Sequence, residues 1–209
     1  MLTRTKRTFI SMNYLAHAYL SFNHPQILVG NMISDFVKGS SQFGYAVNIQ
    51  KGIRLHRAID AFTDNHPATK GAREIFRKDY RLYSGAIIDI IYDHFLANDT
   101  AVFNDASLLA FTDSVYSVLE THTTAMPLVF IPVLTYMRNE NWLYYYKDQD
   151  GIRKSLKGLV RRAAYLSESE TAYRLFTDNH PALRNYYNTF FPDVKNFAKQ
   201  QFDKLLTAE

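Results

Sequence analysis

Three side chains that could do chemistry follow one another at intervals of four residues within the segment 55–67, namely His56, Asp60 and Asp64. On an α-helix, residues at i and i+4 lie on one face about one turn apart, so an imidazole and two carboxylates would form a single stripe. Burying that stripe is costly unless its charge is compensated, and a divalent metal does so. Histidine and aspartate suit Mn, Fe or Zn. The alternative interpretation is a solvated polar face that ends in an N-cap for the next helix.

The first hundred or so residues hold further histidines and aspartates in apolar or helical surroundings. With the stripe they make a set drawn from four expected helices: His17, Asp35, His56, Asp60, Asp64, Asp89, Asp93 and His94. Four helices packed around one pocket could bring these nitrogen and oxygen ligands to one or two metals. A metal there would favour hydrolysis, because it lowers the pKa of bound water and polarises a phosphoryl oxygen. Each residue also has a structural alternative, such as a core histidine bonded to a carbonyl for His17 or a helix-internal hydrogen-bond pair for Asp93 and His94.

Several other chemistries are excluded by the sequence. The chain has no cysteine, which rules out disulfides, thiolate metal sites and cysteine nucleophiles and is compatible with a reducing cytoplasm. It has no Gly-rich phosphate loop of either common pattern and no His-Glu-x-x-His, so nucleotide kinases, Rossmann enzymes and the common zinc proteases are disfavoured. It also lacks the Glu-x-x-His pairs of di-iron bundles and the Gly-x-Ser-x-Gly elbow of hydrolases.

The elements that must position these residues are expected to be helices throughout. Apolar periodicity and Pro or Gly breaks predict helices over 13–22, 27–38, 45–64, 67–80, 84–96, 101–121, 141–147, 152–166, 171–176 and 181–206, with a bend at 126–132. Period-2 alternation over a strand length is scarce. With 47% hydrophobic residues in 209, the sequence predicts one all-α domain over 12–209, preceded by a disordered leader at 1–11.

The net charge of +4 is unevenly distributed. Residues 51–81 hold eight basic and four acidic residues, and residues 151–162 hold five basic and no acidic ones. A localised basic surface attracts acidic partners, although the more ordinary interpretation is a solvated helix face. The longest apolar run, 125–134, is ten residues long and contains two prolines, so we expect no membrane span.

Five motifs in order resemble the acyl carrier protein phosphodiesterase family. They are Asn13-Tyr14-Leu15-Ala16-His17, Gly30-Asn31-x-x-x-Asp35-Phe36, His56-Arg57-x-Ile59-Asp60, Thr63-Asp64-Asn65-x-Pro67 and Asp93-His94-Phe95-Leu96, with a looser match around Trp142. The resemblance runs from Met12 almost to the C-terminus. It implies a divergent HD-domain phosphohydrolase fold, a preference for Mn²⁺ and a cytoplasmic location. The implied reaction releases 4′-phosphopantetheine from the serine of holo-acyl carrier protein, an acidic protein that suits the basic surface.

The resulting site hypothesis assigns a role to each residue. The metal is held by a subset of His17, Asp35, His56, Asp60, Asp93 and His94, with Asp60 also taking part directly in catalysis. The Asp-His doublet at 93–94 stands in the reverse order to the His-Asp doublet of HD domains. Asp64 or Asp89 would orient the attacking water, and Arg57 would stabilise phosphoryl charge.

Two rival functions remain open at this point. The first is another metallophosphohydrolase acting on a nucleotide or small phosphodiester, and the second is a non-catalytic helical module that binds acidic proteins. Neither nucleic acid nor a membrane is expected as a partner.

Overall fold

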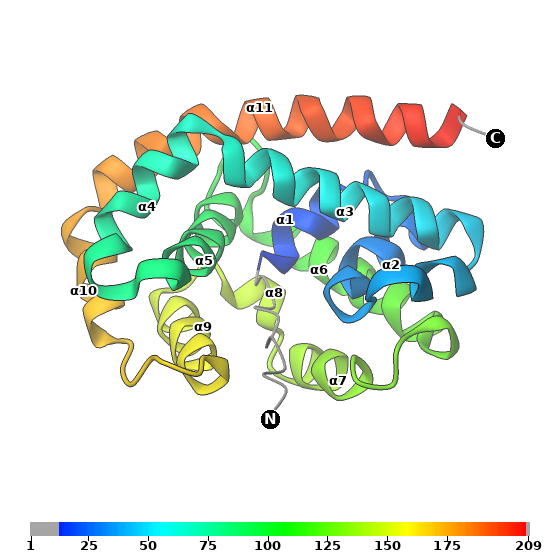
Figure 1. The fold of residues 1–209 in the computed structure, drawn as a ribbon, viewed down its shortest axis with the longest axis horizontal. Helices are drawn as coiled ribbons and strands as arrows, with labels where there is room; N and C mark the ends of the chain where they lie inside the picture. Colours follow the sequence, from blue (N-terminus) through cyan, green and yellow to red (C-terminus); the bar gives the residue numbers. More distant parts are fainter. Residues whose placement is uncertain (1–12, 208–209) are drawn as a thin grey trace, which may run out of the picture.

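The computed structural model describes residues 13–207, and every regular element in that part of the chain is a helix (Figure 1). Their buried faces share one continuous hydrophobic core. The prediction of a single all-α domain is therefore confirmed. The expected leader at 1–11 lies outside the described residues.

The helices are short, apart from α3, α6 and α11. In chain order they are α1 (Tyr14–Tyr19), α2 (Pro25–Ile33), α3 (Val47–Asn65), α4 (Pro67–Tyr80), α5 (Ser84–Ala97), α6 (Asp105–Thr121), α7 (Ile131–Asn139), α8 (Trp142–Tyr145), α9 (Gln149–Arg162), α10 (Glu170–Asp178) and α11 (His180–Thr207). Four 3₁₀ turns accompany them, η1 (Ser34–Phe36), η2 (Gly39–Gly44), η3 (Arg81–Tyr83) and η4 (Thr123–Ala125).

Helices α2 and α3 cross in close contact, and two glycines make that contact possible. A Cβ added to Gly30 would lie 2.0 Å from the carbonyl oxygen of Ile49, and one added to Gly52 would lie 2.2 Å from that of Ile27. Because backbone atoms cannot swing aside as a side chain can, this crossing accepts no larger residue. It brings the residues that follow Gly30 against the middle of α3.

Helix α5 lies at the centre of the core, which explains its apolar sequence. It packs against α1, α4 and α9, and eleven of its fourteen residues are buried. The long helix α11 runs across α3 and α4 (Figure 1). Phe62 of α3 stacks on Phe197 of α11 with ring centroids 4.5 Å apart. Helix α3 is therefore held between α2 and α11.

Proline marks the start of several helices. Pro25 and Pro67 stand in the first turns of α2 and α4, where their missing N–H groups would be unpaired anyway. Pro132 does the same in α7, a helix that the sequence pattern did not predict because the two prolines of 126–132 suggest only a bend. Among the described residues, no helix is both long enough and apolar enough to cross a membrane.

Candidate functional site

Four of the expected site residues converge from three elements. His17 comes from α1, Asp35 from η1, and His56 and Asp60 from α3. The Nε2 atoms of His17 and His56 each lie 3.1 Å from an oxygen of Asp60, and Asp35 Oδ1 lies 3.3 Å from His56 Nε2. The two imidazole rings stack with centroids 4.0 Å apart. The convergence that the sequence could only suggest is present for these four residues.

The buried amide of Asn31 on α2 orients both imidazoles. Its Nδ2 donates to the carbonyl oxygen of His17 at 2.9 Å and to Ser21 Oγ at 3.0 Å. Since that carbonyl only accepts, Oδ1 must be the atom that faces the rings, at 2.7 Å from Nδ1 of His17 and 3.2 Å from Nδ1 of His56. Both Nδ1 atoms therefore carry hydrogen, and in the neutral form of each ring the lone pair is on Nε2, the atom that faces the carboxylates.

The atoms of this group have the spacing of ligands around a cation. Nε2 of His17, Nε2 of His56 and a carboxylate oxygen of Asp60 lie within 4.8 Å of one another and could hold a metal ion. His56 Nε2 is buried and has no hydrogen bond of acceptable geometry, although two carboxylates lie beside it. Two ligand atoms about 2.1 Å from one ion are about 3.0 Å apart when they subtend a right angle and about 3.4 Å apart at the tetrahedral angle. The three nitrogen–oxygen distances given above, 3.1, 3.1 and 3.3 Å, lie within this range. The donor set fits a divalent metal.

The electrostatics of the group favour positive charge. Burial lowers the pKa of His56, but the carboxylates of Asp60 and Asp35 outweigh it and raise this pKa to about 10. Burial and the neighbouring His56 lower the pKa of His17. Burial opposes ionisation of Asp60, yet the two imidazoles hold the pKa of its carboxyl well below the usual range. One protonated imidazole thus stands where a cation would neutralise the carboxylates.

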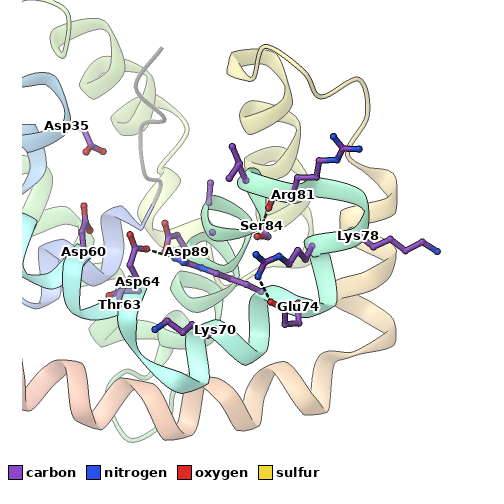
Figure 2. A pocket seen from close by; sticks show the side chains of 15 residues that line it. Asp35, Asp60, Thr63, Asp64, Lys70, Glu74, Lys78, Arg81, Ser84 and Asp89 are labelled. Carbon is purple, nitrogen blue, oxygen red and sulfur yellow. Dashed lines mark hydrogen bonds and ion pairs between the residues drawn. The ribbon is translucent and has the colours of Figure 1, made fainter. Parts of the chain in front are cut away.

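A cleft of about 940 Å³ opens beside these residues and contains both acidic and basic walls. Figure 2 shows Asp35 and Asp60 at one end, Asp64 and Asp89 in the middle, and Lys78 and Arg81 at the far end. Helix α4 supplies most of the basic wall. The cleft therefore joins a candidate cation site to a surface suited to an anion.

Asp64 and Asp89 line this cleft without joining the candidate metal group. Asp64 accepts a hydrogen bond from Arg73 Nη2 at 2.5 Å, an ion pair across the turn from α3 to α4. Arg73 Nε is buried and has no hydrogen-bond partner in the described residues. A Cβ at Gly85 would lie 3.2 Å from Arg73 Nη2, so this glycine leaves room for the guanidinium. Arg73 is a cleft residue that the sequence analysis did not single out.

The structure does not bring Asp93 and His94 into the group. Adjacent residues of a helix point in different directions, and here they serve two different contacts. Asp93 is fully buried and accepts hydrogen bonds from the backbone N–H groups of Leu15 and Ala16, at 3.0 and 2.8 Å. His94 Nδ1 donates to the carbonyl oxygen of Tyr146 at 2.7 Å. Asp93 thereby fixes the start of α1, the helix that carries His17.

Arg57 lies on the outer side of α3, away from the cleft. Its guanidinium donates to the carbonyl oxygen of Val37 and to Gln42 Oε1, each at 3.0 Å. These contacts tie α3 to the segment just after Asp35, so Arg57 positions that carboxylate from behind. The cleft lining contains Arg73 and does not contain Arg57.

Asn31 belongs to one of the five motifs, but its sequence context did not predict a role for it. One signal could have identified it, because an amide within the apolar run 27–33 needs buried partners. Asn31 also stands four residues before Asp35, so one face of that segment carries both. Ser21, which supports the Asn31 amide, carries no comparable signal.

Comparisons with known proteins agree with the resemblance seen in the motifs. The family model described as acyl carrier protein phosphodiesterase matches residues 12–194. The chain is 34% identical over 191 residues to the acyl carrier protein phosphodiesterase of Photorhabdus laumondii, and the aligned region covers 91% of this chain and 96% of that protein. It is 32% identical over 182 residues to that of Salmonella agona, covering 87% and 94% respectively. No solved structure matches significantly, so the relationship to HD-domain phosphohydrolases stays a prediction.

Proposed function

The chain belongs to the acyl carrier protein phosphodiesterase family, and on that premise we propose that it releases 4′-phosphopantetheine from holo-acyl carrier protein. It is a phosphoric diester hydrolase. In the proposed reaction a water oxygen bonds to phosphorus and the bond from phosphorus to the serine Oγ breaks. One water proton ends on the serine oxygen, which leaves the apo carrier protein. The observation that carries the proposal is the match over residues 12–194, which includes the whole candidate metal group and the cleft.

We propose that His17, His56 and Asp60 hold a divalent ion, with Asp35 as a further carboxylate ligand and Mn²⁺ as the ion. Support comes from the donor set and from the buried His56 Nε2, which has no hydrogen-bond partner of acceptable geometry. A divalent ion bound at such a site lowers the pKa of water and polarises a phosphoryl oxygen. Asn31 would leave the Nε2 atom of each ring free to hold the ion, because its oxygen accepts the hydrogen of each Nδ1.

The basic wall of the cleft would bind the diester itself. Arg73 lines the cleft and is held by Asp64, and its guanidinium would bind a phosphoryl oxygen. Lys70 lines the same cleft and adds positive charge beside it. We propose that Asp64 or Asp89, both in the cleft lining, orients the attacking water. We therefore assign the phosphoryl-binding role to Arg73 in place of Arg57.

The decisive experiment is incubation of the purified protein and Mn²⁺ with holo-acyl carrier protein, followed by intact-mass measurement. We expect loss of the prosthetic group, and its prevention by a chelator. Asp60→Asn should reduce the rate by about 100-fold or more, since losing a ligand exceeds the usual effect of losing an outer partner. Asp178→Asn, the same change at an exposed position on α10, should leave the rate unchanged. Turnover of nucleotides with none of the carrier protein would reject the proposal in favour of another metallophosphohydrolase.

A further inference from the structure

The outer end of the cleft carries a surface that the chemistry of hydrolysis does not need. It is formed by Arg77 and Lys78 at the end of α4 and by Arg81 and Leu82 in η3, and we call it the α4–η3 surface. Figure 2 shows Lys78 and Arg81 at the opposite end of the cleft from Asp35. Leu82 is 87% exposed, so its aliphatic side chain is available for contact at the edge of the cleft.

The charges of this surface are available to a partner. Lys78 and Arg81 make no ion pair with any residue between 13 and 207, and Arg77 pairs only with its neighbour Glu74 on the same exposed helix face. An exposed pair of that kind contributes little and exchanges readily. A basic rim around an exposed leucine favours an acidic protein surface over nucleic acid, which offers no apolar side chain to cover Leu82.

The other basic segment of the chain is already compensated. On α9, Arg153 lies 2.8 Å from Glu170 and Lys154 lies 3.4 Å from Glu140. The run of positive charge that the sequence shows at 151–162 is thus partly neutralised by acids from elsewhere in the chain. Three of its five basic side chains lie within 4.0 Å of an acidic one, whereas Lys78 and Arg81 have no such partner among the described residues.

The backbone of Arg81 supplies independent support. Its φ of 46° with ψ of −117° lies outside the regions that residues with a Cβ ordinarily occupy, at the C-terminal cap of α4. Glycine would relieve that strain and is the common residue at such caps. The chain instead keeps an arginine there, which directs its side chain to the rim of the cleft. Strain of this kind points to a functional side chain.

We propose that the α4–η3 surface docks an acidic protein surface that presents an apolar side chain to Leu82. This inference rests on the proposed function, under which that protein is the carrier protein. The bond to be broken joins phosphorus directly to a serine oxygen, so the protein that bears the serine must cover the mouth of the cleft. The α4–η3 surface lines the same cleft as Asp35 and Asp60, so a protein that covers the cleft reaches it, and its partner is therefore the substrate protein itself.

The test compares two variants of the surface with one matched control. Lys78→Glu reverses a charge, and Arg81→Gly removes a charge while it relieves the backbone. Lys154→Glu makes the same reversal on the compensated α9 surface. The readouts are the melting temperature, the dissociation constant for apo-acyl carrier protein, and the KM and kcat for the holo form.

We expect Lys78→Glu and Arg81→Gly to raise both the dissociation constant and KM by about tenfold at low ionic strength, with kcat unchanged. Arg81→Gly should also melt at a higher temperature than the parent, a combination that damage to the fold cannot produce. Lys154→Glu should behave as the parent does. Equal binding by all variants, or a loss confined to Lys154→Glu, would overturn the docking proposal. Binding of the apo carrier protein without hydrolysis of the holo form would instead contradict the proposed function and leave the docking surface standing.

Discussion

The most searching prediction concerns Asn31, which touches no substrate and yet holds both imidazoles. Replacing it by leucine keeps the side-chain volume but removes an acceptor for two buried N–H groups, on His17 and His56, and a donor to the carbonyl oxygen of His17. A buried polar group left without its partner costs about 1–3 kcal/mol. Asn31→Leu should therefore lower the free energy of unfolding of the metal-free protein by about 4 kcal/mol.

The same change should also weaken metal binding. Loss of the outer partner of one ligand lowers metal affinity by about 10–100-fold, and Asn31 is the outer partner of the two imidazoles that we propose as ligands. We expect Mn²⁺ affinity to fall by about 100-fold or more, because either ring can then rotate or exchange the hydrogen between Nδ1 and Nε2. Calorimetric titration with Mn²⁺ and a urea melt of the same sample measure the two effects separately.

Asn48→Leu is the matched control, since Asn48 also joins α3 to α2, through Gln26 at 2.9 Å, but lies outside the group. It should leave Mn²⁺ affinity unchanged. A folded Asn31→Leu protein that binds Mn²⁺ as tightly as the parent would refute the assignment of the two imidazoles as ligands.

Three further predictions test the frame around the group. Gly30→Ala should destabilise the fold by about 3 kcal/mol in a urea melt, because its Cβ would overlap the backbone of α3, whereas Gly44→Ala, which has open space around it, should not. Asp93→Asn should cost about 2 kcal/mol and also weaken Mn²⁺ binding, since one N–H at the start of α1 loses its acceptor; unchanged Mn²⁺ affinity would contradict the role given to α1. Burial lowers the pKa of His94 in the folded protein to about 4. In the unfolded chain the same histidine has a pKa of about 6.5, so as pH falls the unfolded chain takes up a proton before the folded protein does. Stability should then drop by about 2 kcal/mol between pH 7 and pH 5, and His94→Gln should show a smaller drop in parallel urea melts.

The part of the site that the sequence could predict is the part that one helix determines. The four-residue spacing of His56 and Asp60 places both on one face of α3, and the structure shows them joined at 3.1 Å. Asp64 lies one turn further along the same face, close to the end of α3, where its carboxylate forms an ion pair with Arg73 of α4. Local periodicity predicts a shared face, and only the neighbouring helix decides what that face meets.

The contributions of His17 and Asp35 depend on packing that no local pattern encodes. Asp35 reaches His56 because Gly30 and Gly52 let α2 lie directly against α3. His17 reaches Asp60 because α1 packs between α2 and α5. Resemblance to a family could pair these motifs in advance, but their distances follow from the crossing of the helices. For the same reason the basic run at 151–162 could not be judged from sequence, since its compensating acids lie elsewhere in the chain.

The doublet at 93–94 shows how a residue can serve a site without entering it. Helix α1 has only six residues and no side-chain cap from its own Asn13, so its N-terminal N–H groups need an acceptor from outside. Asp93 supplies one from the core helix α5, and burial raises the pKa of its carboxyl despite the two N–H groups it accepts. His94, the next residue, contacts a different element and anchors the end of α8 through the carbonyl oxygen of Tyr146. The aspartate in the apolar helix α5 is therefore explained by the need to hold a short helix whose histidine must stay in place, and Asp93 supports the candidate metal group without belonging to it.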